Sequence, residues 1–327
     1  MNDTAGICTL LDDAGWRQKT EAADRLAAPC RLCPRACGVN RLAGEKGFCR
    51  APGHAVVCSA FPHFGEEPPI SGTRGSGTVF FSYCTLRCPF CQNWRISHEG
   101  AGEPAAPDEL AAMFLRLQEQ GCHNINLVTP DHFLPWILRG LHAAAGAGLR
   151  IPVVYNCSGY QCADALDILD GVVDVYLPDM KYGGDEAARS LSGVADYVTV
   201  NRAAIMAMFR SVGPLKTDSD GVARRGLLIR HLVLPDGLAG SENVAAFLAG
   251  RFDPADMTVS VMAQYRPMHQ ARDHPEINRT VTAQEYREAC GFFTAKELAG
   301  FIQQYESLDG AFCIDFDKRK NEPLTGR

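Results

Sequence analysis

The chain has 327 residues, of which 46% are hydrophobic and 21% charged, proportions typical of folded globular proteins that exclude disorder for most of its length. Its net charge of −6 gives no basic field for nucleic-acid binding, and it shows neither a signal peptide nor a long apolar run. We therefore expect a cytoplasmic protein that has no nucleic-acid partner and no membrane partner.

The first part of the chain falls into two segments that differ in composition and periodicity. Residues 1–28 predict a helix whose apolar positions include Trp16 and Leu26. Residues 29–77 are rich in Cys, Pro, Gly and Arg and show little periodicity, which predicts a loop-rich segment. Something other than a hydrophobic core must organise these loops.

From residue 78 onward, short β-rich runs alternate with helical stretches. The predicted strands cover residues 78–82, 124–129, 151–156, 172–177, 227–234 and 258–263. Helices are predicted after Pro107 and Ser241, and Thr282 opens a third with a sequence typical of a capping box. Six strands alternating with helices predict parallel βαβ units, as an open doubly wound sheet or a complete or partial (β/α) barrel. Both arrangements place functional residues at the carboxyl ends of the strands.

Four cysteines in the loop-rich segment are spaced C-x2-C-x3-C-x11-C, namely Cys30, Cys33, Cys37 and Cys49. Cysteines remain reduced in the cytoplasm, so a cluster of them indicates metal binding rather than disulfides. Four thiolates can close a tetrahedral zinc site or hold an auxiliary [4Fe-4S] cluster, and both alternatives are open. A bound metal would also organise a segment that has little core of its own.

A second set, Cys84, Cys88 and Cys91, directly follows the first predicted strand. Three thiolates within eight residues suit an iron–sulfur cluster better than structural zinc, which takes four protein ligands. An iron without a protein ligand is a place where a substrate or cofactor can bind.

The second set resembles the cluster motif of the radical S-adenosylmethionine (SAM) superfamily, since the spacing is CxxxCxxC and the aromatic Phe90 precedes the last cysteine. The sequences YCTLRCPFCQNWRIS and FPHFGEEPPISGTRGSG resemble a branch of uncharacterised iron–sulfur proteins related to pyruvate formate-lyase activating enzymes. The resemblance extends over residues 30–310 and implies an α/β fold, a partial (β/α)6 TIM-like barrel of parallel strands. We expect three parts: an N-terminal helix and Cys-rich metal-binding extension (1–76), the barrel (77–312) and a C-terminal tail (313–327).

The resemblance also implies a chemistry. Cys84, Cys88 and Cys91 would ligate a [4Fe-4S] cluster whose open iron chelates SAM. An electron from the cluster would cleave SAM to methionine and a 5′-deoxyadenosyl radical, which abstracts hydrogen from an unidentified substrate. Side chains near the strand ends would contact the cofactor, namely Phe90, Thr129, Asp131, Asn156, Ser158, Asp179, Lys181 and His231. Arg230 and His231 point to opposite sides of a strand, so only one faces the lumen, and we expect it to be His231.

The resemblance leaves the reaction open. It implies an oxidoreductase resembling pyruvate formate-lyase activating enzymes, with an electron donor such as flavodoxin or ferredoxin. One alternative is a glycyl-radical activase that acts on a protein partner, with another protein or peptide substrate also possible. A different class would be a non-catalytic iron–sulfur electron-transfer protein. An activase needs a mouth open to a protein loop, whereas an enzyme for small molecules would have its entrance capped, for example by residues 50–76.

Other residues have weaker assignments. The segment 63–70 is either a loop at the substrate site or a solvated connector. Gln264, Tyr265 and Arg266, at the end of the sixth predicted strand, are expected to line the pocket. The remaining cysteines are expected to pack in the core, although Cys157 could approach the barrel mouth; they are Cys8, Cys58, Cys122, Cys157, Cys162, Cys290 and Cys313.

Overall fold

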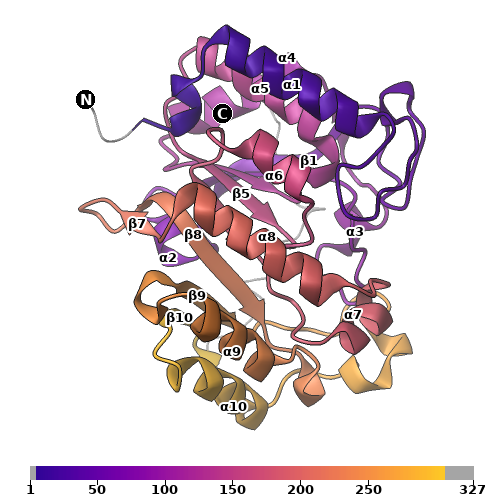
Figure 1. Cartoon of the computed structure of the whole chain (residues 1–327), viewed down its shortest axis with the longest axis vertical. Helices are drawn as coiled ribbons and strands as arrows, with labels where there is room; N and C mark the ends of the chain where they lie inside the picture. The colour runs from indigo at the N-terminus through magenta and orange to yellow at the C-terminus, as the bar shows by residue number, and fades with distance from the viewer. Residues whose placement is uncertain (1–4, 306–327) are drawn as a thin grey trace.

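The computed structural model describes residues 5–305, and its centre is one large sheet (Figure 1). The strand order is β10-β9-β8-β6-β5-β4-β2-β1-β3, and β7 pairs with β8 outside this path. The strands are β1 (Ala55–His63), β2 (Ser76–Phe81), β3 (Glu103–Ala105), β4 (Ile125–Val128), β5 (Val153–Cys157), β6 (Val175–Pro178), β7 (Lys216–Thr217), β8 (Ala223–Leu232), β9 (Thr258–Met262) and β10 (Ala299–Ile302). The predicted tail and Cys313 lie outside the described residues.

The six strands predicted from the sequence are confirmed as β2, β4, β5, β6, β8 and β9. They lie next to one another in chain order, and every pair among these neighbours is parallel. This order is that of a barrel, since a doubly wound sheet reverses direction at a switch point. Over residues 5–305 the sheet ends at β10 and β3, which agrees with the partial barrel that we expected.

Helices connect the parallel strands and cover the outer side of the sheet (Figure 1). Asp12 caps the first long helix, since its side chain accepts a hydrogen bond from the Gly15 amide. Thr282 and Glu285 form the predicted capping box at the start of the last one. The helices are α1 (Asp13–Ala27), α2 (Pro68–Ser71), α3 (Trp94–Ser97), α4 (Pro107–Glu119), α5 (Leu134–Gly146), α6 (Ala163–Leu169), α7 (Asp185–Ser192), α8 (Tyr197–Val212), α9 (Ser241–Arg251) and α10 (Ala283–Thr294).

The N-terminal residues are built into the same body as the barrel. Helix α1 packs on α5 and α6, and Trp16 and Leu26 belong to the main hydrophobic core. The loop-rich prediction for residues 29–77 is wrong for β1, which pairs antiparallel with β2. Within residues 5–305, no helix combines the length and the apolar character needed to cross a bilayer.

Candidate functional site: two cysteine-lined cavities and a charged barrel interior

The loop after β2 brings three cysteine side chains to one cavity. Cys84, Cys88 and Cys91 line a space of about 200 Å³ at the carboxyl ends of the parallel strands. The Leu86 amide donates to Cys84 Sγ at 3.4 Å and the Ser97 hydroxyl donates to Cys91 Sγ at 3.2 Å. These donors are aimed at sulfur, which favours the thiolate form that a metal ligand needs.

The environment of the thiols shows why a metal would be required to ionise them. Burial raises the pKa of Cys84 to about 12, with neighbouring thiols adding to the effect, and burial also raises the pKa of Cys91. Bare thiols would therefore be protonated at neutral pH, whereas the positive charge of bound iron favours thiolates. Three soft donors around one cavity fit a [4Fe-4S] cluster that leaves one iron open.

Charged side chains from neighbouring strands form a network beside the thiols. Asp179 accepts from Arg230 Nε at 2.9 Å through one carboxylate oxygen and from Lys181 Nζ at 2.5 Å through the other. Arg230 also donates to Asn156 Oδ1 at 2.6 Å and contacts Glu66 at 3.4 Å. Burial alone would raise the pKa of Asp179, but Arg230 and Lys181 hold it below its usual range. The carboxylate is thus charged and fixed in orientation.

Most of the predicted cofactor-binding residues line the cysteine cavity. Lys181 and Asp179 do so as expected, and the Thr129 backbone lies in the left-handed region at φ 57°. Such a conformation is uncommon for a β-branched residue and is often found at functional sites. The predicted residues that line the cavity are Phe90, Thr129, Asn156, Ser158, Asp179 and Lys181.

The prediction for Asp131 is wrong. Its buried carboxylate accepts hydrogen bonds from Tyr155 at 3.0 Å and from Gln161. Tyr155 and Asn156 are adjacent in β5 and therefore point to opposite faces of the sheet, and Asn156 faces the cavity. Asp131 accordingly lies on the helix side, where burial raises its pKa to about 6.

The preference for His231 over Arg230 is also wrong. The His231 ring is fully buried on the outer side, where its nitrogens contact the Met180 carbonyl and the Ser241 hydroxyl and the ring lies near Phe293 of α10. Burial lowers the pKa of His231 to about 4, so the ring is neutral. Arg230 faces the cavity instead. Alternation along β8 required one of the two to face inward but did not identify which.

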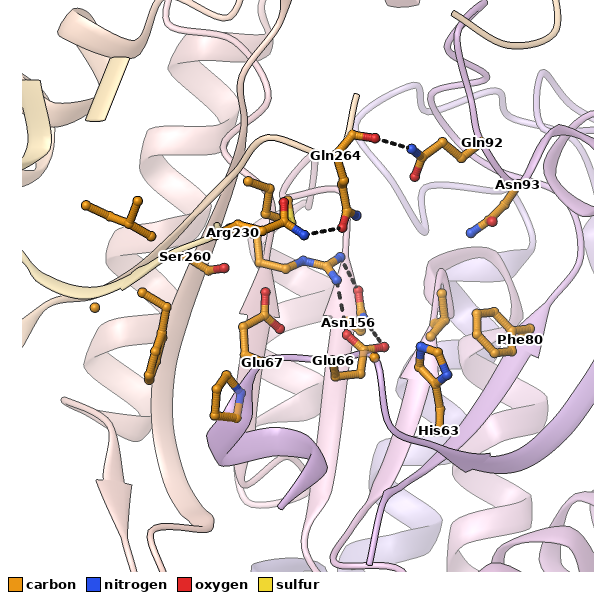
Figure 2. A pocket seen from close by; sticks show the side chains of 18 residues that line it. His63, Glu66, Glu67, Phe80, Gln92, Asn93, Asn156, Arg230, Ser260 and Gln264 are labelled. Carbon is orange, nitrogen blue, oxygen red and sulfur yellow. Dashed lines mark hydrogen bonds and ion pairs between the residues drawn. The ribbon is translucent and has the colours of Figure 1, made fainter. Parts of the chain in front are cut away.

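A larger cavity of about 580 Å³ adjoins the cysteine-lined one inside the curved sheet (Figure 2). Both cavities are lined by Gln92 and Gln264, whose side chain and backbone form a 2.7 Å hydrogen bond between the cysteine loop and the end of β9. The two cavities share further lining residues, namely Asn93, Val128, Asn156, Arg230 and Met262. They therefore form one continuous interior.

The segment 63–70 is part of this interior rather than a solvated connector. Glu66 and Glu67 line the larger cavity, and both are buried in it (Figure 2). We expected this segment to be a loop at the substrate site in one of two alternatives but assigned no role to the two adjacent carboxylates, which stand between an apolar strand and a Pro-Pro pair. Of the three residues predicted at the end of the sixth strand, Gln264 and Tyr265 line the cavities and Arg266 does not. Tyr265 donates to the Ile277 carbonyl, which indicates a packing role.

The other cysteine set surrounds a separate, small cavity. Arg41 is 1% exposed and donates to Cys30 Sγ at 3.5 Å and Cys49 Sγ at 3.3 Å. Cys33 and Cys37 line the same cavity. Three buried polar atoms without a protein partner belong to its other lining residues, namely Arg41 Nε, Thr85 Oγ1 and His132 Nδ1.

Among residues 5–305, no group of three or more His, Cys, Asp and Glu side chains is arranged to hold a single metal ion. Direct coordination of one zinc at about 2.3 Å per Zn–S bond would bring the sulfurs closely together. A cluster of several irons and sulfides holds its thiolates further apart. The two sets are alike in this respect. The predicted packing role of Cys157 agrees with its burial, although it also borders the first cavity.

Comparison with known proteins supports this interpretation of the site. Residues 78–211, which contain the loop with Cys84, Cys88 and Cys91, match the model of the Radical SAM superfamily. An uncharacterized protein of Methanocaldococcus jannaschii is 33% identical over 279 residues, which are 83% of this chain and 76% of that protein.

Two solved structures are similar at low identity. A radical SAM methyltransferase from Sphaerobacter thermophilus is 18% identical with a TM-score of 0.47, over 72% of this chain and 69% of that one. Streptococcus suis SuiB bound to the precursor peptide SuiA is 11% identical with a TM-score of 0.43, over 68% of this chain and 47% of that one. The family match and the relative, together with the three thiols at the strand ends, show that the chain belongs to the radical SAM superfamily.

Proposed function

We propose that this protein cleaves SAM reductively and uses the resulting 5′-deoxyadenosyl radical to abstract hydrogen from a substrate held inside the barrel. Membership of the superfamily implies the [4Fe-4S] cluster and SAM. The observation that carries the proposal is that the thiol-lined cavity joins a cavity large enough for a substrate. Arg230 and Asn156 line both cavities. Cys84, Cys88 and Cys91 would hold the cluster, which would supply the electron that breaks the sulfonium bond of SAM.

The chain's own residues position the cofactor. Asp179 and Lys181 present fixed charges that suit the amino and carboxylate groups of SAM, while Asn156 and Ser158 offer an amide and a hydroxyl group to the ribose. Phe90 lies in the same lining and offers a flat apolar surface to the adenine.

The segment that lines the larger cavity favours a substrate enclosed within the barrel over a glycyl-radical activase acting on a protein. Glu66, Glu67 and Pro68 line the larger cavity, and they belong to the segment that we expected to cap the entrance of an enzyme for small molecules. A passive electron carrier would have no use for a network such as Asp179, Lys181 and Arg230 beside the cysteines. A low-potential one-electron donor such as flavodoxin or ferredoxin would reduce the cluster in the cell.

The test is an anaerobic assay of 5′-deoxyadenosine after reconstitution with iron and sulfide and addition of dithionite and SAM. We expect product from the wild type and none from Cys88→Ala, because three thiolates are needed to hold the cluster. Cys122→Ala is the matched control, since Cys122 is 2% exposed and lines neither cavity, and the variant should retain activity. Absence of product from wild-type protein with a confirmed [4Fe-4S] cluster would refute the proposal.

We also propose that Cys30, Cys33, Cys37 and Cys49 hold a second iron–sulfur cluster. The support is the buried guanidinium of Arg41, which contacts two of these thiols. A buried positive charge needs an anionic partner, and thiolates bound to a metal centre provide one. The unpartnered polar atoms of Arg41 and Thr85 can donate to the sulfides of a cluster, whereas a zinc ion with four thiolates carries no sulfide.

Metal analysis of a variant that lacks Cys84, Cys88 and Cys91 isolates the site formed by the other four cysteines. In the triple variant Cys84→Ala, Cys88→Ala, Cys91→Ala we expect about four irons and four sulfides per chain, the content of one cubane cluster. Adding Cys33→Ala should remove them. If metal analysis finds one zinc per chain instead, the site binds zinc and the cluster proposal is wrong. If it finds neither iron nor zinc, these cysteines form no metal site.

A further inference from the structure

The connected interior holds more carboxyl groups than cations. Three carboxylates lie in the connected interior, Glu66, Glu67 and Asp179, against two cations, Lys181 and Arg230. Both cations already have partners: Arg230 contacts Asp179, Asn156 and Glu66, and Lys181 contacts Asp179. Asp179 and Lys181 line only the cysteine-lined cavity, where they are assigned to SAM, so a carboxylate or phosphate on a substrate in the larger cavity would lie beside Glu66 and Glu67.

Glu67 is the carboxylate in this interior that has an unpartnered oxygen. It is 8% exposed and its Oε2 has no hydrogen-bond partner among the described residues. Figure 2 shows the side chain beside Ser260 in the cavity wall, with its carboxylate directed to the interior. An unpaired buried carboxylate oxygen is costly, because burial removes its water without supplying a donor. A ligand that brings hydrogen-bond donors and positive charge would remove this cost.

We propose that the substrate carries a primary amine, bound as an ammonium group by Glu67 with Glu66 beside it. The proposal rests on the proposed function, since it assigns the substrate of the same interior. An ammonium group has three donors and no acceptor, which matches the Glu67 oxygen that has no donor among the described residues. The charge-assisted hydrogen bond that forms is stronger than one between neutral groups.

The other residues that line the cavity indicate the chemistry of the rest of the substrate. Phe80, Val128, Met262, Phe301 and Ile302 give the same cavity a largely apolar wall. A carbon chain attached to the ammonium group would lie along this wall. It would extend from Glu67 toward Gln92 and Gln264, the side on which the cavity joins the cysteine-lined one. The carbon that loses hydrogen would then be remote from the amine.

Three probes of equal length test the chemistry of the head group: hexylamine, hexanol and hexanoate. Their dissociation constants are measured anaerobically by titration calorimetry against reconstituted protein with SAM bound. We expect hexylamine to bind at least about tenfold more tightly than the other two, because a hydrogen bond between charged groups is worth about 1.5–3 kcal/mol. In Glu67→Gln this advantage should fall by about tenfold, and Glu66→Gln should weaken hexylamine by a smaller factor.

Glu119→Gln is the control, since Glu119 is exposed at the end of α4 and far from the cavity, and its affinities should equal those of the wild type. Circular dichroism of each variant shows whether it has folded, and Glu66→Gln replaces Glu67→Gln in the comparison if the latter has not. Equal binding of hexanol or hexanoate, or full hexylamine affinity in both variants, would overturn the amine assignment. The 5′-deoxyadenosine assay is scored separately, so failure of the amine assignment and failure of SAM cleavage are distinguishable.

Discussion

Arg230 is the residue on which the charged interior depends. It is about one-sixth exposed and holds Asp179, Glu66 and the Asn156 amide oxygen in one arrangement. Lysine could not replace it, because a single ammonium group cannot match the fork of a guanidinium that contacts several acceptors at once. Removing one partner of a buried ion pair leaves the other charge uncompensated, which costs about 3–5 kcal/mol.

Arg230→Met should therefore destabilise the protein by about 3 kcal/mol at pH 8, as measured by anaerobic urea denaturation. Burial already raises the pKa of Glu66 and Glu67 although Arg230 opposes the effect, so both pKa values rise further in the variant. A carboxyl whose pKa is higher folded than unfolded loses stability as the pH rises through the unfolded value. The loss of unfolding free energy in Arg230→Met, relative to the wild type, should thus be smaller at pH 5 than at pH 8.

Arg224→Met is the matched control, because Arg224 pairs with Asp218, which lies in the turn between β7 and β8. Both side chains are 22% exposed, and an ion pair near the surface contributes about 0–1 kcal/mol. A deficit in Arg230→Met that is no larger than this, or one that is independent of pH, would contradict the role assigned to Arg230.

Among the elements, the loop between β2 and α3 serves both cysteine sites. Cys84 lines the larger of the two cysteine-lined cavities, while the next residue, Thr85, lines the one formed by the first set. Arg35 of the first set's segment donates to the Thr85 carbonyl at 2.8 Å. Arg35 therefore links the segment that carries Cys33 and Cys37 to the backbone next to Cys84.

The elements also show how far the sequence could be interpreted. The six central strands were predictable because each is a compact β-rich run between turn residues and helices. β1 was missed because the cysteines and prolines around it obscured its apolar run, and β10 because its residues are mostly exposed and offer no hydrophobic pattern. The cysteine ligands were predictable from spacing within one loop. Glu66 and Glu67 were not, because their place depends on a packing of β1 against β2 that no local pattern reveals.

At the scale of the whole molecule, the N-terminal extension and the barrel share one hydrophobic core. Trp16 of α1 is 1% exposed and its ring stacks on His142 of α5 at 5.5 Å between ring centroids. Residues of the first cysteine set, including Cys30 and Cys49, belong to the same core cluster. An extension joined in this way should unfold together with the barrel rather than as a separate unit.

The variant Trp16→Ala tests whether the N-terminal extension and the barrel unfold together. Truncating a buried tryptophan costs about 3–5 kcal/mol, and the loss should appear in the stability of the whole protein. Anaerobic denaturation followed by far-ultraviolet circular dichroism and by the visible absorbance of the bound clusters should give coincident curves, both shifted to lower denaturant in the variant. Leu10→Ala is the control, because Leu10 is 81% exposed and its truncation should change the midpoint little. If the helical signal in Trp16→Ala were lost well before the cluster absorbance, α1 would be an independent appendage. Coincident loss would show that α1 and the cluster-binding barrel unfold in one cooperative transition.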